Sequence, residues 1–564
     1  MRADEWIVDF LIKKGVTDVF GIPGVVVMDF LYAVDGRKPE ITPHLSYHEQ
    51  AAAFAACGYA QTSGKLGVAY STRGPGVTNM ITAIADAYYD SIPTMFITAH
   101  SSEKLSDEMR VMNNQEIDTV SLVQNVTKRA VRVDRIEDLQ REVIYCYNAA
   151  TQGRKGPVFL DIYNKLFDNE VGDISINVCE DTVDKSEVSV VVEEIIARIS
   201  KSKRPVFLIG NGVRNQKNID ILKNIVNKFN IPVLSSRAAQ DIIPDDKEYY
   251  GYVGSRATRY SNFILSKADL IVALGNRMAF PINSKSFRPI VESAYTIRIE
   301  VDESELCRNI PNSSNYAVDV SSILPALSEV DLSYNNSKEW NNVCKELKQK
   351  LDLYDNNLAI ESIGHIIKSA DASMPIVCDV GNHSFWVTIA YAYQKAINRI
   401  MYSGSFGTLG CALPKAIGAY YSDKKTVLCF TGDQGVQFNL QELQYIASHK
   451  IPVVVVILNN TSSGMIMERE VAKHGTHLVH TTTNDGYSYP DFKKIANCFD
   501  INYYRIEKQT DLVELNRSTL NEPAIVEMMI DINTPLYPKL PVGEVCQKLV
   551  PKLPDELFEY LNAI

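Results

Sequence analysis

The chain has 564 residues, of which 46% are hydrophobic and 22% are charged. This length predicts several domains with large buried cores, and the composition is ordinary for a soluble globular protein. The net charge of −11 argues against a nucleic-acid binder, because neutralising phosphates requires a basic face.

The ten cysteines are scattered and form no CxxC pair, so we expect buried thiols in a reducing compartment and no structural zinc site. The first residues, "MRADEWIVDFLIKKGV", carry charges throughout and lack the apolar core of a signal peptide. The chain has no apolar run of about 18 residues, the length a membrane helix requires. These features predict a cytoplasmic enzyme that has no membrane partner.

Apolar runs alternate with helical stretches along the whole chain. Most of these runs are continuously apolar, which is typical of parallel strands buried on both faces. The fold class is therefore α/β, with doubly wound parallel sheets. The predicted strands are 19–22, 67–71, 94–99, 157–162, 205–210, 232–236, 270–275, 296–302, 375–380, 426–432, 452–460 and 524–531.

Two polar stretches, 169–187 and 332–342, predict linkers between three domains of similar size. The predicted domains are 1–170, 188–331 and 343–534, followed by a proline-rich tail, 535–564, that ends in a short helix.

The first and last domains also resemble each other in layout. Residues 58–76 and 418–435 both have the order helix end, polar turn, strand and glycine turn. We therefore expect these two domains to share one topology.

One glycine turn has the shape of a phosphate-binding loop but carries a carboxylate. In "TGDQG", Asp433 follows an apolar run, and the loop contains no Lys or Arg. The next strand ends in Asn459 and Asn460, at the edge of the sheet where ligands bind. Taken singly, an Asp that caps a helix and an Asn pair in a turn are the simpler interpretations. Together, their oxygens predict a Mg²⁺ ion that bridges to a diphosphate.

This pair resembles the motif of thiamine-diphosphate enzymes, and the resemblance extends over nearly the whole chain. The segments "SYHEQAAAFAACGYAQTSGKLGV", "GPGVTNMITAIADAYYDSIP", "CDVGNHSFW", "SGSFGTLGCALPKAIGA" and "ILNNTSSGM" are similar to acetolactate synthase and its relatives, in the same order. The resemblance implies pyrimidine, central and diphosphate domains, each built on a parallel sheet. It also implies thiamine diphosphate and Mg²⁺ as cofactors, and a homodimer or homotetramer with active sites between subunits.

The resemblance implies catalytic roles for a few residues. Glu49 matches the glutamate that hydrogen-bonds the pyrimidine ring and favours its imino tautomer, whose nitrogen removes the thiazolium C2 proton. Leu409 matches the apolar wedge that bends the cofactor, and the Gly407 carbonyl would accept a hydrogen bond from the cofactor's amino group. Gln115 matches a glutamine near the thiazolium.

Other positions match the cofactor cradle and the metal site. The metal ligands would be Asp433, Asn460 and the Ser462 carbonyl. Further residues that match the cradle are Gly24, Gly381, Asn382, His383, Gly432, Gln434, Gly435, Gly464 and Met465.

The sequence departs from this family in its acceptor half. Gln434 replaces a small residue, at a position that varies among relatives. In "NRMAFP", Arg277 is kept, but Pro281 stands where a second Arg would hold the acceptor carboxylate, which proline cannot pair. Arg469 stands where the synthases carry a Trp that selects an aliphatic acceptor, and Arg73 replaces a small residue beside the cofactor loop. Arg73 is either a surface residue or a contact to an anionic substrate.

These departures favour a carboligase whose donor half is kept and whose acceptor half is rebuilt. We expect it to decarboxylate a 2-keto acid, with pyruvate as the first candidate, and to transfer the two-carbon unit to a carbonyl acceptor such as a keto-sugar nucleotide. A plain acetolactate synthase, a flavin-dependent pyruvate oxidase and a simple decarboxylase are the alternatives. A catalytically inactive scaffold and a Rossmann dehydrogenase are disfavoured, because Glu49, Asp433 and Asn460 are intact and no GxGxxG follows the first strand.

The motif "HGTHLVH" spaces His474, His477 and His480 three residues apart. The interpretations are a solvated loop, a histidine that contacts substrate, with His477 as the candidate, and a zinc site.

FAD is a further cofactor that the resemblance leaves open. The positions where its contacts would lie are Gly210 to Gly212, Arg277, Glu300 and Asp319. The glycine pair is a weak signal, because it lacks a full dinucleotide fingerprint.

Overall fold

The structure is a computed structural model that describes residues 1–102, 113–172, 185–331 and 337–564. The chain divides into two compact units: Met1–Cys179, Ser369–Ser384 and Arg399–Ile532 form the first, and Glu180–Lys368, Phe385–Asn398 and Asn533–Ile564 form the second. Among the described residues, no helix is long and apolar enough to span a membrane.

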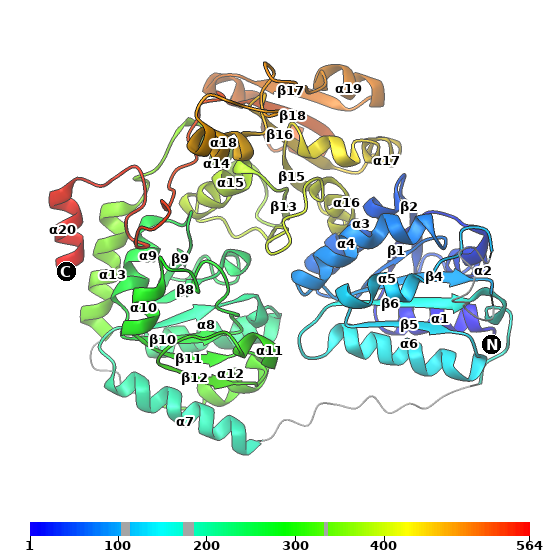
Figure 1. Ribbon diagram of the computed structural model, residues 1–564, viewed down its shortest axis with the longest axis horizontal. Helices are drawn as coiled ribbons and strands as arrows, with labels where there is room; N and C mark the ends of the chain where they lie inside the picture. The colour runs from blue at the N-terminus through cyan, green and yellow to red at the C-terminus, as the bar shows by residue number, and fades with distance from the viewer. Residues whose placement is uncertain (103–112, 173–184, 332–336) are drawn as a thin grey trace. The chain divides into compact units, whose positions relative to one another are not determined.

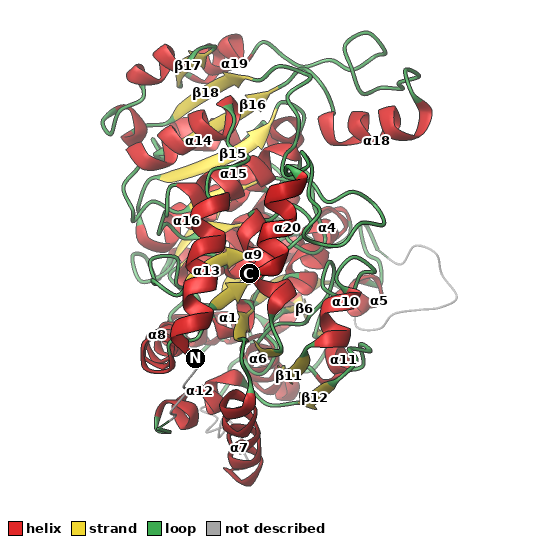
Figure 2. Ribbon diagram, turned by 90° about the vertical axis from the view of Figure 1, so that its left-hand side faces the viewer, coloured by secondary structure: helices red, strands yellow, loops and turns green. Residues whose placement is uncertain are grey.

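The first unit contains two six-stranded parallel sheets, and Figures 1 and 2 show their strands between layers of helices. The strand orders are β2-β1-β3-β4-β6-β5 and β14-β13-β15-β16-β18-β17. When the strands of each sheet are numbered from one, both orders read 2-1-3-4-6-5. The predicted shared topology of the first and last domains is therefore confirmed. The bounds are β1 Asp18–Gly21, β2 Thr42–Leu45, β3 Gly67–Tyr70, β4 Thr94–His100, β5 Arg129–Val133, β6 Pro157–Tyr163, β13 Ile376–Cys378, β14 Ile400–Met401, β15 Val427–Gly432, β16 Val453–Asn459, β17 Asn502–Ile506 and β18 Ala524–Met529.

The second unit contains the third parallel sheet, in the order β12-β11-β10-β7-β8-β9. This is the order of a doubly wound nucleotide-binding sheet. The bounds are β7 Pro205–Ile209, β8 Val233–Ser235, β9 Tyr249–Tyr252, β10 Leu270–Leu274, β11 Tyr295–Ile299 and β12 Ser313–Tyr316. The predicted α/β class with three parallel sheets is therefore confirmed, whereas the predicted domain boundaries stay a prediction.

Helices lie between most consecutive strands along the chain, as crossovers between parallel strands require. Their bounds are α1 Ala3–Lys13, α2 Met28–Asp35, α3 Glu49–Ser63, α4 Pro75–Tyr89, α5 Thr119–Val123, α6 Ile136–Thr151, α7 Lys185–Lys201, α8 Gln216–Phe229, α9 Arg259–Lys267, α10 Arg288–Ser293, α11 Glu303–Leu306, α12 Val320–Ser328, α13 Ser337–Leu351, α14 Leu358–Ser369, α15 Asn382–Tyr393, α16 Ala412–Asp423, α17 Glu442–Ser448, α18 Gly464–His474, α19 Phe492–Phe499 and α20 Asp555–Ala563.

The two predicted linkers have different outcomes. Most of 169–187 lies outside the described residues. The second, 332–342, is helical from Ser337, where α13 begins, and this helix packs on α9. Lys338, Glu339 and Asn342 of this stretch are exposed, whereas Trp340, Asn341 and Cys344 are buried, as in an amphipathic helix.

Helices α3 and α16 cross with their backbones in contact, and this crossing joins the two sheets of the first unit. A Cβ atom on Gly58 would lie 2.0 Å from the Lys415 carbonyl oxygen, and a Cβ on Gly418 would lie 1.8 Å from the Ala55 carbonyl oxygen. The residues of α3 from Ala51 to Ala60 are all buried. Small residues are therefore required on both helices at this crossing.

A buried ion pair lies at the same crossing. The Lys415 ammonium of α16 donates to the Asp86 carboxylate of α4 at 2.6 Å, and both side chains are almost fully buried. Removing one partner of such a pair leaves an uncompensated charge in a low dielectric, which typically costs about 3–5 kcal/mol. The pair therefore fixes how α4 and α16 face each other.

We expect Gly418→Ala to destabilise the first unit, because the new methyl group overlaps a backbone carbonyl that cannot rotate away. Overpacking of this kind costs about 1–3 kcal/mol or more. The measurement is the urea midpoint followed by circular dichroism. Gly36→Ala is the matched control, since Gly36 has φ −66° and its added Cβ would approach no other atom closer than 3.4 Å. Equal midpoints for the two variants would contradict the close crossing.

Candidate active site

The predicted cofactor loops follow three adjacent strands of one sheet. Strand β15 pairs with β13 on one side and with β16 on the other. The loops after these strands carry Gly381 to His383, Gly432 to Gly435, and Asn460 to Gly464. Because all three strands are parallel, their carboxyl ends meet at one edge.

The space around Gly464 shows that residues distant in sequence converge at this edge. A Cβ on Gly464 would lie 2.5 Å from Asn460 Nδ2 and 3.5 Å from both Asn382 Nδ2 and Ser462 Oγ. Gly464 is therefore required by the side chains that gather there. Asn382, at the start of α15, also donates to Glu468 Oε1 at 3.0 Å.

His383 lies against the two other glycine turns of the site. A Cβ atom added to Gly381, which has φ +147°, would lie 2.8 Å from His383 Nδ1. A Cβ atom added to Gly432 would lie 3.4 Å from the same nitrogen. The structure thus brings together the predicted cradle residues of "VGNH" and "TGDQG".

Asp433 is buried at the centre of this cluster, with 2% of its surface exposed. Burial raises the pKa of its carboxyl group to about 6, against the lowering effect of Tyr487 and of backbone N–H groups that include Thr461. Burial also raises the pKa of the Tyr487 phenol, and the Asp433 carboxylate adds to this effect. A cation beside Asp433 would favour the ionised carboxylate.

Several buried polar atoms at this edge have no hydrogen-bond partner among the described residues. They are Asn382 Oδ1, Asp433 Oδ2, Ser462 Oγ and Tyr487 Oη. Buried polar groups are normally paired, so this concentration indicates a polar ligand. A carboxylate, amide oxygens and hydroxyls suit a hard cation with a diphosphate, so the residues present fit Mg²⁺ and thiamine diphosphate.

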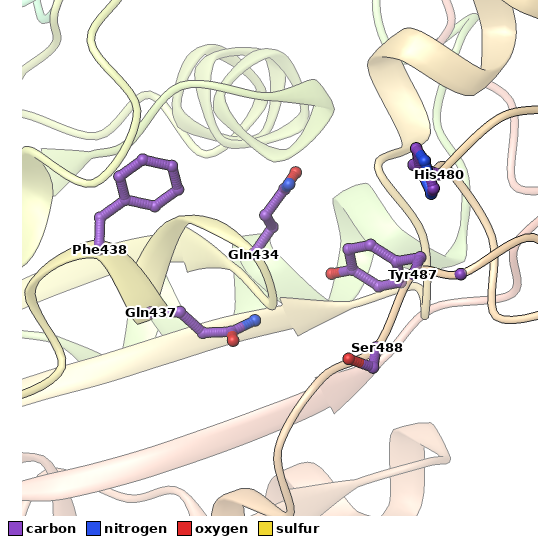
Figure 3. Close-up of a pocket in the computed structure, with 7 residues that line it drawn as sticks. Gln434, Gln437, Phe438, His480, Tyr487 and Ser488 are labelled. Carbon is purple, nitrogen blue, oxygen red and sulfur yellow. The ribbon is translucent and has the colours of Figure 1, made fainter.

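A cavity of about 340 Å³ opens beside Gln434. Figure 3 shows Gln434 between Phe438 and Tyr487, with His480 at the upper side of the view. The residues that line this cavity are Gln434, Gln437, Phe438, His480, Gly486, Tyr487 and Ser488. His480 of the "HGTHLVH" motif therefore lies near the cradle.

The loop with Gly407 and Leu409 is held by carboxylates that the sequence analysis did not single out. Asp90 accepts hydrogen bonds from the backbone N–H groups of Gly404 and Ser405, at 2.7 and 2.8 Å. Asp379 accepts one from the Gly410 N–H at 2.8 Å. Burial raises the pKa of Asp379 to about 6.

Asp86 also holds this loop, since Thr408 Oγ1 donates to it at 3.1 Å. The sequence signal that could have identified these carboxylates is that they lie within segments already matched to the family. Asp86 and Asp90 lie in "ADAYYDSIP", and Asp379 lies in "CDVGNH". Gly407 has φ +74° and no atom within 4 Å of an added Cβ, so its surroundings are open.

Glu49 is the first residue of α3, a helix that packs on the other sheet of the first unit, the one formed by β1 to β6. The His48 side chain caps this helix by accepting from the Gln50 N–H, and Asn79 Nδ2 donates to Glu49 Oε2 at 2.9 Å. Asn79 leaves the other carboxylate oxygen of Glu49 available for a hydrogen bond to a ligand. Asn79, which lies in "GPGVTN", was not predicted.

A buried carboxylate lies next to this helix start. Glu442, the first residue of α17, accepts from the Tyr47 N–H at 2.9 Å, and its other oxygen has no partner among the described residues. Burial raises the pKa of Glu442 to about 7. Glu442 therefore fixes the backbone two residues before Glu49.

The remaining predicted residues fall in three places. Gly24 packs on Thr72, at the same sheet edge as Glu49, because a Cβ there would lie 2.6 Å from Thr72 Cβ. Arg73 contacts the segment that carries Gln115. Arg469 and His477 are exposed, on α18 and in the loop after it, and Met465 is partly buried at the start of α18. Among the described residues, no group of His, Cys, Asp or Glu is arranged to hold a zinc ion, His474 included.

In the second unit, the predicted FAD positions have structural partners. Gly210 and Gly212 pack against Gly275, since added Cβ atoms would lie 2.1 and 2.8 Å from its backbone. Asp319 caps α12 by accepting from the Ser321 N–H. These contacts account for the glycine pair without a ligand, so FAD stays open.

Three family models match the chain. They are the thiamine pyrophosphate enzyme N-terminal TPP binding domain over residues 1–122, the central domain over 192–327 and the C-terminal TPP binding domain over 379–528.

Similar curated proteins match along the whole length. The chain is 30% identical to the acetolactate synthase large subunit of Lactococcus lactis subsp. lactis, over 96% of this chain and 94% of that protein. It is also 30% identical to the acetolactate synthase isozyme 2 large subunit of Escherichia coli K12, over 98% and 100%. A probable acetolactate synthase large subunit of Methanocaldococcus jannaschii is 28% identical, over 100% and 98%.

We expect Glu442→Gln to stabilise the protein at pH 8 and to leave its stability at pH 4 nearly unchanged. The folded-state pKa of Glu442, about 7, lies above the usual value of 4.5, so the folded protein binds more protons between these values than the unfolded chain. The free energy of unfolding contributed by this group therefore falls as the pH rises from about 4.5 to 7, and the amide removes that loss. Urea midpoints across this range test the expectation. A Glu40→Gln control, at an exposed site, should leave the pH profile unchanged.

Proposed function

Because the chain belongs to the thiamine pyrophosphate enzymes, in the family of the acetolactate synthase large subunits, we propose that it decarboxylates a 2-keto acid, with pyruvate as the first candidate, and transfers the two-carbon unit to a carbonyl acceptor. The observation that carries this proposal is the cluster of Asp433, Asn382 and Ser462, whose unpartnered buried oxygens match the diphosphate and metal of the cofactor.

When bound, thiamine diphosphate supplies a carbanion that the protein alone cannot form. Asp433 and Asn460 would hold Mg²⁺ together with the Ser462 carbonyl, and Asn382 and His383 would contact the diphosphate. Glu49 would exchange a proton with the pyrimidine ring, and Asn79 keeps its carboxylate oriented for that exchange. Leu409 would hold the cofactor bent, on a loop that Asp90 and Asp379 fix at both ends.

The acceptor half is where this chain would differ from the named relatives. Arg469 adds positive charge where the resemblance places a Trp, which supports an anionic acceptor such as a keto-sugar nucleotide. His477, exposed beyond α18, is a further candidate contact. Acetolactate synthesis, in which a second keto acid is the acceptor, is the alternative that the relatives' names favour.

A homodimer or homotetramer is part of this proposal. Large apolar side chains are exposed beside both halves of the site: Tyr47 is 46% exposed, and Tyr89 and Phe406, which stack on each other, are 46% and 45% exposed. Burying them against a second copy would bring the Glu49 of one subunit to the Asp433 of another. The expected cytoplasmic location stays a prediction.

We expect Glu49→Gln to fold and to bind thiamine diphosphate while losing at least about 100-fold in kcat, because a neutral amide cannot exchange the proton. Calorimetry reports cofactor binding, and CO₂ release from pyruvate reports turnover. Glu40→Gln, in the same domain, is the control and should keep full turnover. Near-normal turnover in Glu49→Gln would exclude this carboxylate from the proposed role.

The acceptor is tested with the purified protein, thiamine diphosphate, Mg²⁺ and pyruvate, with and without a panel of acceptors that includes keto-sugar nucleotides. We expect new product masses only when a carbonyl acceptor other than pyruvate is present. Acetolactate as the main product from pyruvate alone would instead favour the synthase alternative. A bound flavin that bleaches with pyruvate and reoxidises in air would favour an oxidase.

A further inference from the structure

Arg73 makes two hydrogen bonds to the segment around Gln115. Its Nε donates to the Asn114 carbonyl oxygen at 2.9 Å, and its Nη1 donates to Ser101 Oγ at 2.5 Å. Ser101 follows β4, whereas Asn114 lies next to Gln115. One guanidinium therefore joins two points of the chain that are distant in sequence.

Gln115 has a backbone conformation that requires support. Its φ is +62°, the left-handed region that non-glycine residues rarely adopt, at a cost of about 1–3 kcal/mol. Its carbonyl oxygen lies against the glycine turn that follows Arg73, since a Cβ on Gly74 would be 2.1 Å away from it. The Arg73–Gly74 turn thus contacts Asn114 through the Arg73 side chain and Gln115 through the Gly74 backbone.

The residue after Gln115 is anchored from the other side. Glu116 is buried, and its carboxylate accepts from the Ser102 N–H at 3.0 Å and from Ser102 Oγ at 2.7 Å. Gln115, whose side chain is exposed, therefore lies between two anchored neighbours, Asn114 and Glu116. Arg73 provides one of these two anchors.

We propose that Arg73 is a positioning residue that holds Gln115 at the active site, rather than a direct contact to substrate. This inference rests on the proposed function, in which Gln115 lies near the thiazolium. The geometry depends on the guanidinium fork, because Nε and Nη1 point at two different acceptors. A lysine offers one ammonium group and keeps the charge without this geometry.

The first test is a double-mutant cycle between Arg73→Ala and Gln115→Ala, read as kcat/KM for pyruvate. If Arg73 acts through Gln115, Arg73→Ala lowers kcat/KM at least tenfold in the wild type and less than about twofold in the Gln115→Ala background. Effects that multiply would overturn the proposal. Arg73→Lys should behave like Arg73→Ala, and recovery of activity by the lysine would show that the charge alone matters.

The second test does not depend on turnover. Hydrogen exchange should accelerate at least tenfold at the Ser102 and Glu116 amides in Arg73→Ala, because the anchor between their segments is lost. Arg135→Ala removes an exposed arginine from the same domain and should leave both amides unchanged. Unchanged protection of both amides in Arg73→Ala would overturn the proposal that Arg73 holds this segment in place. A wild-type protein that turns over no 2-keto acid would refute the proposed function, while the exchange result would still decide the role of Arg73.

Discussion

The close crossing of α3 and α16 is the constraint on which the first unit depends. Gly58 and Gly418 let the two backbones touch, and the buried Asp86–Lys415 pair fixes the neighbouring helix α4 against the same crossing. Helix α3 begins at Glu49, and α16 follows the loop with Gly407 and Leu409. Any shift at the crossing would therefore move residues that the proposed chemistry requires in fixed positions.

Buried carboxylates organise the loops around this crossing by accepting backbone N–H groups. Asp90 and Asp379 hold the two ends of the Leu409 loop, and Glu442 holds the chain just before Glu49. Each of these carboxylates fixes its loop because it is the hydrogen-bond partner of backbone N–H groups there, and such groups require a partner. Asp433, Asn382 and Ser462 each keep one buried oxygen that has no partner among the described residues.

The central strands could be predicted from the sequence, but the edge strands could not. The twelve predicted runs correspond to strands with two neighbours in their sheets, whereas β2, β5, β9, β12, β14 and β17 were missed. These six are the edges of the three sheets. An edge strand such as β12, "SSNY", has one neighbour and half-exposed residues, so it lacks the continuous apolar run that marks a central strand.

The residues of the site likewise divide into those that the sequence indicated and those that only the structure showed. Asp433 and Asn460 follow apolar strands within recognisable turns, so the sequence alone indicated a metal and diphosphate site and, through the resemblance, the role of Glu49. Only the tertiary structure showed the roles of Asn79, Asp379 and Glu442 and the hydrogen bonds of Arg73 to the segment around Gln115.

Local patterns determined the central strands and the residues with a chemical signature, because apolar periodicity and turn glycines act over a few neighbouring positions. Which carboxylate holds which loop depends on contacts between segments far apart in the chain, such as Arg73 with Asn114 or Glu442 with Tyr47. Those contacts are decided by how the sheets and helices pack, and the packing rests on two glycines that no local pattern distinguishes from others.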